Sequence, residues 1–371
     1  MDWPIIIVAA TLLVAYANGA NDNFKGVATL FGSGTTAYRT ALGWGTITTL
    51  AGSVTAFFLA GELISIFQGK GLVSAELSES EPFVAAVVLG AALTVILATK
   101  IGMPISTTHS LTGALFGGGL VAVGLDLGFK ALALDFFMPL LISPLCAAAI
   151  ATFGFPLLSR GLKRAGLNQE KCLCVEAGTP SMVTPEGVVF IESTPGLRII
   201  IDREMVCAQP KSQTILGING QKLLDASHFL SAGAVSFARG LNDTPKIVAL
   251  GLVASALDLR VSILLVAVTM MFGGLLNTSA VAQTVSKKIT GMEPEHGLWA
   301  NVVTSVLVIF ASKWSMPVST THVSCGALFG IGIANRRAQS RVIRAILLAW
   351  LLTLPMAALF SAGVYLLVRQ L

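Results

Sequence analysis

Long apolar stretches alternate with short polar segments along most of this chain. Seven of these stretches approach the roughly 20 residues that an α-helix needs to cross a bilayer. They lie near Pro4–Ala17, Ala41–Ala60, Phe83–Ala98, Phe136–Phe155, Val261–Ala282, Leu298–Ala311 and Val342–Leu367. The pattern predicts an all-α polytopic membrane protein.

Composition supports the same class. Of the 371 residues, 54% are hydrophobic and 12% are charged, which is about half the charged fraction of an ordinary soluble domain. The net charge of +5 comes from residues spread over several loops, so it does not indicate nucleic-acid binding. The N-terminus carries Asp2 and no basic run, unlike a secretory signal.

The least hydrophobic stretch, residues 160–225, separates two membrane halves. Its prolines and its alternating runs at 187–191 and 197–201 predict a small β-rich loop domain. The expected organisation is a first membrane repeat over 1–159, a cytoplasmic loop domain over 160–225 and an inverted second repeat over 226–371. Cys172, Cys174 and Cys207 have no histidine near them in this stretch, so reduced cytoplasmic thiols are a better interpretation than a metal site.

Loop charges predict the orientation in the membrane. Basic residues at Arg160–Arg164, Arg39, Lys287-Lys288 and Arg336–Arg344 indicate cytoplasmic loops by the positive-inside rule. The segment 62–81 has four glutamates and one lysine, which favours the outer face. We therefore expect a multi-pass protein of the plasma or inner cell membrane, with both termini outside and the central loop in the cytoplasm.

Two short motifs occur twice, in the same order. Met-Pro-x-Ser-Thr-Thr-His begins at Met103 and again at Met316, while Asn-Asp occurs at Asn21 and again at Asn242. Since the first half makes an odd number of crossings, the second half begins on the opposite face, and the chain is expected to be an inverted repeat. Interrupted segments at matching positions of two inverted halves indicate a binding site near the bilayer midplane.

The segments Phe83–Thr99 and Pro104–Gly124 allow two interpretations. They form either two full crossings or a re-entrant helical hairpin whose tip stops at mid-membrane. The hairpin is favoured, because full crossings would place the hydroxyl residues near a surface and Lys313 in an outer loop. Lys100 and Lys313 would then lie near the hairpin tips, where they assist an anion or simply pair or snorkel.

The repeated hydroxyl triads predict an anion site. Pro104 and Pro317 end any preceding helix, and Ser and Thr are good N-caps for the helix that follows. Helix starts offer free N–H groups and a partial positive charge, which suit an anion without a cationic side chain. The alternative is that these hydroxyls only bond neighbouring helices. The expected anion ligands are Ser106, Thr107, Thr108, Ser319, Thr320 and Thr321.

The Asn-Asp pairs are expected to lie at helix breaks, since Gly19, Gly240 and Pro245 favour unwinding. A carboxylate at a membrane helix centre costs roughly 2.5–3.5 kcal/mol, and two of them would repel an anion. Small cations remove that conflict. Na⁺ is favoured over a divalent metal, because the number of oxygens per site is too low for Ca²⁺ and no His/Cys cluster is present for zinc. The alternative is structural ion pairing with Lys25, Lys246 or Arg239. The expected cation ligands are Asn21, Asp22, Asn242 and Asp243, with Ser106, Thr107, Ser319 and Thr320.

Residues next to these motifs have less defined roles. Asn23 and Thr244 follow the aspartates and are expected to add donors to the anion site, near Asp22 and Asp243. His109 and His322 directly follow the triads. For both histidines, capping or bridging a broken helix is favoured over a proton relay. No cofactor is expected other than Na⁺ as the coupling ion.

These residues together resemble the inorganic phosphate transporter (PiT) family. The likeness rests on Gly19-Ala20-Asn21-Asp22, Asn242-Asp243 and the paired Pro-x-Ser-Thr-Thr-His blocks, and it covers both membrane halves. It implies cation-coupled uptake of inorganic phosphate, driven by Na⁺ or H⁺, with the Asn-Asp and Ser-Thr-Thr residues forming the phosphate and cation region. The chain departs from the family after the first Asn-Asp, where Asn23-Phe24-Lys25 replaces small residues.

We therefore expect a Na⁺-coupled phosphate symporter that works by alternating access. A proton-coupled phosphate or sulfate symporter is the main alternative. A membrane enzyme that uses Ser-Thr-Thr-His for phosphoryl or acyl transfer is disfavoured, because neither block has an adjacent carboxylate to orient the histidine. The small-residue face Ala357–Gly363 would permit a homodimer.

Overall fold

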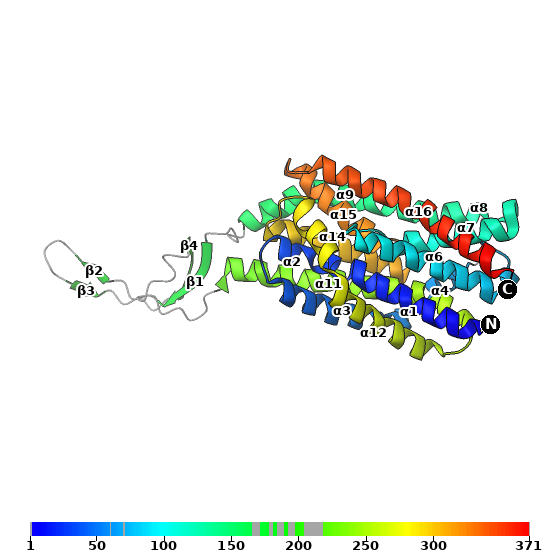
Figure 1. Cartoon of the computed structure of the whole chain (residues 1–371). Coiled ribbons are helices and arrows are strands. Elements are labelled where there is room, and N and C mark those ends of the chain that lie inside the picture. Colours follow the sequence, from blue (N-terminus) through cyan, green and yellow to red (C-terminus); the bar gives the residue numbers. More distant parts are fainter. Residues whose placement is uncertain are drawn as a thin grey trace. The chain divides into compact units, whose positions relative to one another are not determined.

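The computed structural model describes all residues except 1, 60, 70, 165–170, 178–180, 184–188, 192–196, 204–217 and 371, and it leaves out the side chains of 163 and 171–221. Cys207 and the thiols of Cys172 and Cys174 therefore lie outside the described part. The chain divides into two compact units, Met1–Phe155 with Phe229–Leu371, and Pro156–His228. The first unit holds the helices that carry the repeated motifs (Figure 1).

The first half of the chain contributes nine α-helices and three short 3₁₀- or π-helical segments. The elements are α1 (Trp3–Asp22), η1 (Lys25–Val27), α2 (Ala28–Gly32), α3 (Tyr38–Leu59), α4 (Gly61–Phe67), α5 (Ala75–Ser78), α6 (Glu81–Lys100), α7 (Thr107–Val123), η2 (Gly124–Asp126), α8 (Phe129–Ala131), η3 (Leu132–Phe137) and α9 (Met138–Arg164). The second half contributes α11 (Gly220–Gly251), η4 (Leu252–Ala254), α12 (Leu259–Asn277), α13 (Ser279–Gln283), η5 (Thr284–Lys288), α14 (Pro294–Lys313), α15 (Thr320–Ala334) and α16 (Ser340–Val368).

Among the described residues, seven helical stretches are long and apolar enough to cross a membrane. This confirms the polytopic helical architecture. The stretches are Trp3–Gly32, Tyr38–Leu59, Glu81–Lys100, Thr107–Asp126, Phe129–Leu162, Leu259–Asn277 and Ser340–Val368.

Helices of the two halves pack against each other where a glycine of one helix meets the backbone of another. A Cβ added to Gly273 of α12 would lie 2.0 Å from the Tyr16 carbonyl oxygen of α1, and one added to Gly52 of α3 would lie 2.0 Å from the Phe237 oxygen of α11. Phe237 follows Tyr16 by the same number of residues as Gly273 follows Gly52. The two crossings are therefore equivalent in the two halves. Each motif-bearing helix, α1 or α11, therefore packs closely against the helix that follows the other motif.

The hairpin helices α7 and α15 also pack against helices of the opposite half. Gly117 of α7 meets the Ala358 carbonyl of α16, where an added Cβ would lie 2.1 Å from the oxygen. Gly330 of α15 meets the Ala148 carbonyl of α9 in the same way, at 2.3 Å. Each hairpin is thus supported by the final helix of the opposite half.

The small-residue face predicted as a dimer contact is used inside the protomer. Ala357 and Ser361 are fully buried, because the Cβ positions of Gly113 and Gly118 in α7 lie against them. Ala357 and Ser361 are therefore covered by α7, whereas Gly363 at the end of the same face is exposed and has nothing within 4 Å of its Cβ position. The homodimer stays a prediction.

The two hairpins place the triads in the interior of the first unit, and the triads do not lie at the hairpin turns. α6 and α14 have 20 residues each and are therefore about 30 Å long, and of these two helices only α6 is among the stretches apolar enough to cross a membrane. After α6 the chain turns at Gly102, whose carbonyl accepts a hydrogen bond from Thr284. The non-helical residues 103–106 then return toward the interior. The triad is therefore placed by this extended return and not by the turn itself.

The Asn-Asp expectation holds for the first half and is wrong for the second. α1 ends at Asp22 and a turn leads into η1, whereas α11 runs without interruption through Asp243 and Pro245. Proline removes one backbone donor, which a membrane helix tolerates where neighbouring helices support it. Gly240 serves packing, since a Cβ there would lie 2.1 Å from the Thr49 carbonyl oxygen.

The second unit contains short strands. β1 (Lys171–Ala177) pairs antiparallel with β4 (Leu197–Arg203) and with β5 (Ile218–Asn219), which gives the order β4-β1-β5. β2 (Ser181–Val183) pairs antiparallel with β3 (Val189–Ile191). β3 and β4 coincide with the two alternating runs in the sequence.

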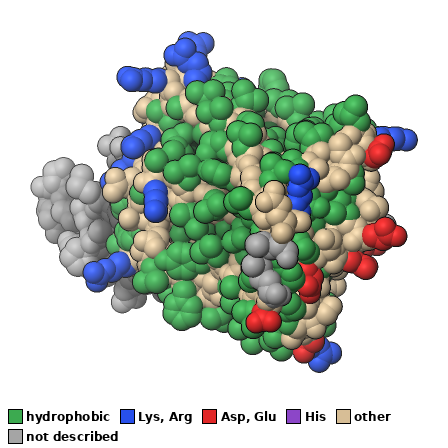
Figure 2. Space-filling model, turned by 45° about the vertical axis from the view of Figure 1, so that its right-hand side comes forward, with side chains coloured by type: hydrophobic (Ala, Val, Ile, Leu, Met, Phe, Trp, Pro, Cys, Tyr) green, Lys and Arg blue, Asp and Glu red, His purple; other side chains and the backbone are tan. Residues whose placement is uncertain are grey.

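The surface of the first unit is mostly apolar between two charged ends. Figure 2 shows a broad hydrophobic band, with the acidic side chains mainly on the right and most basic side chains on the left and top. The exposed acidic residues include Glu62, Glu76, Glu79, Asp126 and Asp258, and the exposed basic residues include Arg39, Lys287, Lys288, Arg336, Arg337, Arg341 and Arg344.

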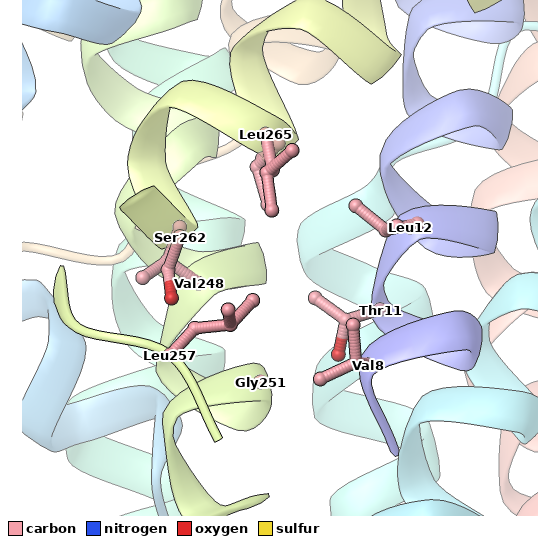
Figure 3. Close-up of a pocket in the computed structure, with 9 residues that line it drawn as sticks. Val8, Thr11, Leu12, Val248, Gly251, Leu257, Ser262 and Leu265 are labelled. Atoms are coloured by element: carbon pink, nitrogen blue, oxygen red, sulfur yellow. The ribbon is translucent and has the colours of Figure 1, made fainter. Parts of the chain in front are cut away.

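A small internal cavity of about 20 Å³ lies between α1, α11 and α12 (Figure 3). Its lining is apolar except for Thr11 and Ser262, and Gly251 closes one side. This volume is close to that of a single water molecule and is far too small for a polyatomic anion. The cavity is therefore a packing gap between helices and not a substrate site.

Candidate substrate site

Both triads form N-capped helix starts with the same backbone geometry. Ser106 (φ −104°, ψ 121°) accepts a hydrogen bond from the His109 N–H, and Ser319 (φ −103°, ψ 116°) accepts one from the His322 N–H, both at 3.2 Å. The helices that follow have 17 and 15 residues. Two full helix starts, each with unpaired N–H groups and a partial positive charge, are therefore present.

The two helix starts meet at one place. The Thr321 hydroxyl donates to the Ile105 carbonyl at 3.1 Å, and the Thr108 hydroxyl donates to the Val318 carbonyl at 3.4 Å. Just beyond, the His109 and His322 rings lie 4.2 Å apart between centroids. Residues more than 200 positions apart in the chain thus form one cluster, and all six triad residues are buried in it.

Two carboxylates lie beside this cluster and are linked by Asn18. Its Nδ2 lies 2.9 Å from Asp22 Oδ2 and 3.2 Å from Asp243 Oδ2. The same Nδ2 lies 2.9 Å from Thr107 Oγ1, which in turn donates to Asp22 Oδ2 at 3.2 Å. Asn18 Oδ1 is buried and has no hydrogen-bond partner among the described residues.

Asn18 was missed in the sequence, where it is an isolated polar residue in an apolar helix. The signal that identifies it is the alignment of the two halves at Gly19 and Gly240. In that alignment Asn18 matches Arg239, and both precede a Gly-x-Asn-Asp sequence.

The two asparagines of the Asn-Asp pairs hold the extended returns of the hairpins. Asn21 Nδ2 donates to Thr99 Oγ1 at 2.9 Å and to the Met103 carbonyl at 3.1 Å. Asn242 Nδ2 donates to the Val318 carbonyl and to Thr320 Oγ1, both at 3.2 Å. Each asparagine therefore fixes the hairpin of its own half against the helix that carries the aspartate.

Two lysines, Lys25 and Lys246, enter the cluster. Lys25 Nζ forms an ion pair with Asp22 and hydrogen bonds to Asn21, Ile105 and Thr321. Lys246 Nζ lies 2.9 Å from Thr108 Oγ1 and 3.9 Å from Asp243 Oδ1. The ion pairing that the sequence left open as the alternative role of the aspartates is thus present in the structure.

Arg239, four residues before Asp243 in α11, is a third buried cation. It is 1% exposed, and its Nε, Nη1 and Nη2 have no hydrogen-bond partner among the described residues. A guanidinium offers five N–H donors in a planar fork that matches phosphate geometry. An unpaired guanidinium inside a membrane protein is costly, so Arg239 is a group that a bound anion would stabilise.

Other residues singled out in the sequence lie elsewhere. Asn23 Nδ2 donates to Thr46 at 2.8 Å and the Thr244 hydroxyl donates to Ser53 at 2.8 Å, so both contact α3 and not the triads. Lys100 and Lys313 are exposed. His322 stacks on Trp350, with ring centroids 3.8 Å apart, consistent with a bridging role.

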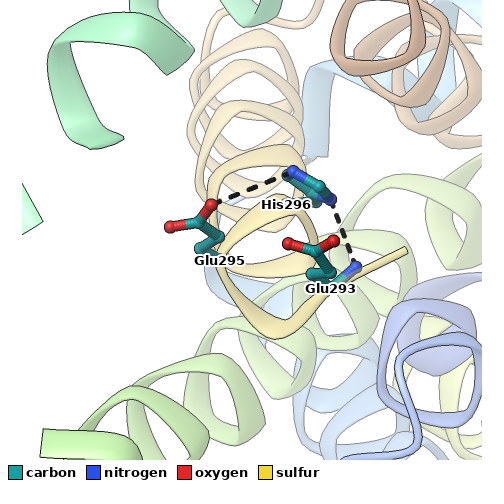
Figure 4. A group of neighbouring side chains, drawn as sticks. All are labelled: Glu293, Glu295 and His296. Atoms are coloured by element: carbon teal, nitrogen blue, oxygen red, sulfur yellow. Dashed lines mark hydrogen bonds and ion pairs between the residues drawn. The ribbon is translucent and has the colours of Figure 1, made fainter. Parts of the chain in front are cut away.

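A second cluster, Glu293, Glu295 and His296, has the composition of a metal site (Figure 4). Its groups are used locally, however. His296 Nδ1 accepts a hydrogen bond from the Glu293 N–H at 3.2 Å, which forms a capping box at the start of α14. Glu293 Oε1 also accepts a bond from Arg337 at 2.9 Å. We therefore interpret this cluster as a helix cap.

Comparison with known proteins decides the family. The sequence profile of the phosphate transporter family matches residues 18–361, which includes both Asn-Asp pairs and both triads. The chain belongs to the phosphate transporter family. Membership in a family of transporters also confirms the expectation that the protein is not an enzyme.

Relatives in this family match over nearly the whole chain. A candidate phosphate permease of Pyrococcus abyssi is 26% identical over 98% of this chain and 97% of its own length. Inorganic phosphate transporter 2-1 of the Arabidopsis thaliana chloroplast is 28% identical over 94% of this chain and 70% of its own length. A solved structure named a sodium-dependent phosphate transporter has the same fold, with a TM-score of 0.78, 22% identity and complete coverage of both chains.

Proposed function

We propose that the protein imports inorganic phosphate by Na⁺-coupled symport with alternating access. The observation that carries the proposal is the meeting of two N-capped helix starts beside two buried carboxylates. Thr108 and Thr321 each bond the extended return of the opposite hairpin. An anion that binds there is held from both halves at once, and movement of one half against the other would change its access.

The phosphate ligands in this proposal are the six triad residues together with the buried cations. The helix starts supply backbone N–H groups and hydroxyls, which suit phosphate oxygens. Arg239 supplies an unpaired guanidinium. The family to which the chain belongs transports phosphate, which favours phosphate over sulfate.

For Na⁺ the structure favours the place between the two aspartates. Asp22 Oδ2, Asp243 Oδ2 and Thr107 Oγ1 surround Asn18, whose free Oδ1 would add a fourth oxygen after rotation of the amide. Oxygens of this kind are suitable ligands for a hard cation. The name of the solved structure with the same fold, a sodium-dependent transporter, supports Na⁺ over H⁺.

The proposed orientation places the basic end of the first unit in the cytoplasm and both termini outside. The charge separation in Figure 2 supports it by the positive-inside rule. Figure 1 labels α6 and α7 nearer the end with the two chain termini and α14 and α15 nearer the other end. Hairpins that enter from opposite ends, with matching glycine crossings, support an inverted repeat in the cell membrane.

Uptake of radiolabelled phosphate into proteoliposomes tests the proposal. We expect accumulation when a Na⁺ gradient is imposed at constant pH, and little uptake when a pH gradient is imposed without Na⁺. Thr108→Val and Thr321→Val should each raise the KM for phosphate, because each removes a hydroxyl from the anion site. Thr55→Val is the control, since that hydroxyl is exposed and bonds only its own helix at Ala51.

Three results would contradict parts of this proposal. Accumulation driven by the pH gradient without Na⁺ would favour the proton-coupled alternative. Equal competition by sulfate would remove the selectivity for phosphate. Unchanged kinetics in both threonine variants would place the anion elsewhere.

A further inference from the structure

The lysines that follow the two aspartates occupy equivalent places in the two halves. Lys25 lies three residues after Asp22, and Lys246 lies three residues after Asp243. Their side chains are 3% and 1% exposed. A lysine so deeply buried in a membrane protein is expensive and usually functional, and here the same residue occurs twice at the same spacing.

The Lys25 ammonium is surrounded by oxygens from four residues. Nζ lies 2.7 Å from Asn21 Oδ1, 2.6 Å from the Ile105 carbonyl and 2.9 Å from Thr321 Oγ1, and it also contacts Asp22 Oδ1. An ammonium has three N–H donors, so these four oxygens exceed its hydrogen-bonding capacity. Carboxylate, amide, carbonyl and hydroxyl oxygens around one point form the kind of site that a hard metal cation prefers.

The Lys246 ammonium repeats two of these contacts in the second half. Its Nζ lies 2.6 Å from the Val318 carbonyl and 2.9 Å from Thr108 Oγ1. Ile105 and Val318 both precede a triad, and Thr108 and Thr321 both end one. Each lysine therefore bonds the carbonyl before the triad of its own half and the last hydroxyl of the other triad.

The fixed charges of the site already favour an anion. Asp22 and Asp243 contribute two negative charges, whereas Lys25, Lys246 and Arg239 contribute three positive charges, and all five residues are buried. The excess of one positive charge comes from the chain itself. The repulsion between an anion and the two carboxylates, which the sequence suggested Na⁺ must relieve, is thus relieved in large part by the lysines.

We propose that Lys25 and Lys246 act as tethered cations, each of which fills the place of one Na⁺ beside the transported phosphate. The inference rests on the proposed function, because it concerns the same anion site. It follows that this protein carries fewer Na⁺ ions per phosphate than a transporter with a neutral residue at each position. The place among Asn18, Asp22, Asp243 and Thr107 remains for a single mobile Na⁺.

Sodium binding to the purified full-length protein tests this directly. Radioactive sodium bound at equilibrium, in the presence of inorganic phosphate, is counted for the wild type and for Lys25→Met. Methionine keeps most of the aliphatic stem but lacks the ammonium, which leaves a place framed by the four oxygens. We expect the variant to bind one more Na⁺ per protomer than the wild type.

The controls separate charge from packing. Lys25→Arg retains a cation and should bind no additional Na⁺. Lys100→Met removes an exposed lysine at the end of α6 and should match the wild type in both binding and uptake. In proteoliposomes, the ratio of sodium to phosphate flux should rise by one ion in Lys25→Met and stay constant in both controls.

The outcomes separate a failure of the tethered-cation inference from a failure of the proposed function. A folded Lys25→Met protein with no additional Na⁺ overturns the inference, and so does a wild-type protein that binds two or more Na⁺ per protomer. Phosphate uptake driven by a pH gradient alone overturns Na⁺ coupling, yet the difference between Lys25→Met and wild type still decides the role of Lys25. If Lys25→Met does not fold, the wild-type count and Lys246→Met give the same decision.

Discussion

Asn18 is the residue that joins the two buried carboxylates. Its amide nitrogen contacts Asp22, Asp243 and Thr107, although an amide has only two N–H donors. Without it the carboxylates would face each other in a medium of low dielectric constant, where like charges repel strongly. The arrangement of the site thus depends on a side chain that carries no charge.

Replacing Asn18 by leucine should lower the stability of the protein. The substitution keeps the side-chain volume similar but removes the hydrogen bonds to two carboxylates, each worth about 1.5–3 kcal/mol. We expect a clear fall in the thermal unfolding midpoint of the purified protein in detergent. Thr55→Val is the matched polar-to-apolar control, and equal midpoints for the two variants would argue against the bridging role.

Single site residues were predictable from the sequence where they belong to a motif that occurs twice, and residues outside such a motif were missed. The Ser-Thr-Thr triads and the aspartates were identifiable because each pattern occurs twice. Asn18 differs in type from its counterpart Arg239, so the repeat did not mark Asn18 as a site residue, and Arg239 was considered only as an ion-pair partner of the aspartates. Asn23 was misplaced because its neighbour in sequence, Asp22, faces the triads, whereas Asn23 contacts Thr46 in α3.

At the scale of the elements, close helix crossings hold the motif-bearing helices in place. Gly52 of α3 meets the Phe237 carbonyl of α11, and Gly273 of α12 meets the Tyr16 carbonyl of α1. Small residues allow membrane helices to approach closely and gain van der Waals contact. These crossings lie one to two turns before Asp22 and Asp243, so they fix the depth of both carboxylates.

Gly52→Ala should therefore destabilise the protein, while Gly43→Ala in the same helix should not. The new Cβ at position 52 would lie 2.0 Å from a backbone oxygen, whereas nothing lies within 4 Å of the Cβ position at Gly43. Overpacking of this kind costs about 1–3 kcal/mol, and alanine at an unobstructed helix position gains up to about 1 kcal/mol. Thermal unfolding of both variants measures the difference; similar midpoints would show that α3 shifts without cost.

The sequence predicted the long helices better than their interruptions: six of the seven predicted stretches overlap membrane-length helices, while Leu298–Ala311 does not and Thr107–Asp126 is the seventh such helix. Apolar runs directly indicate membrane helices, whereas a break depends on what packs beside it. Pro245 lies inside the continuous α11, and Gly240 in the same helix serves a crossing and not a turn. The hairpin turns lie away from the triads for a similar reason, since only the structure shows that residues 103–106 return as an extended segment.

At the scale of the whole molecule, the separation of charged ends predicts the topology. Single cysteines introduced at Glu79 and at Arg344, both exposed, should differ in reactivity in intact cells. A membrane-impermeant maleimide should label the Glu79→Cys protein, which lies at the acidic end, and should label Arg344→Cys only after the membrane is opened. The reverse result would invert the proposed orientation.

The exchange of contacts between the halves has a consequence for biosynthesis. α7 packs against α16 through Gly113 and Gly117, yet α16 begins at Ser340, long after α7 has left the ribosome. At about 5–20 residues per second, the interval between these helices is on the order of tens of seconds. During that interval the newly inserted first hairpin has only lipid or an assisting protein against its glycine face, and its final burial waits for the last helix to be made.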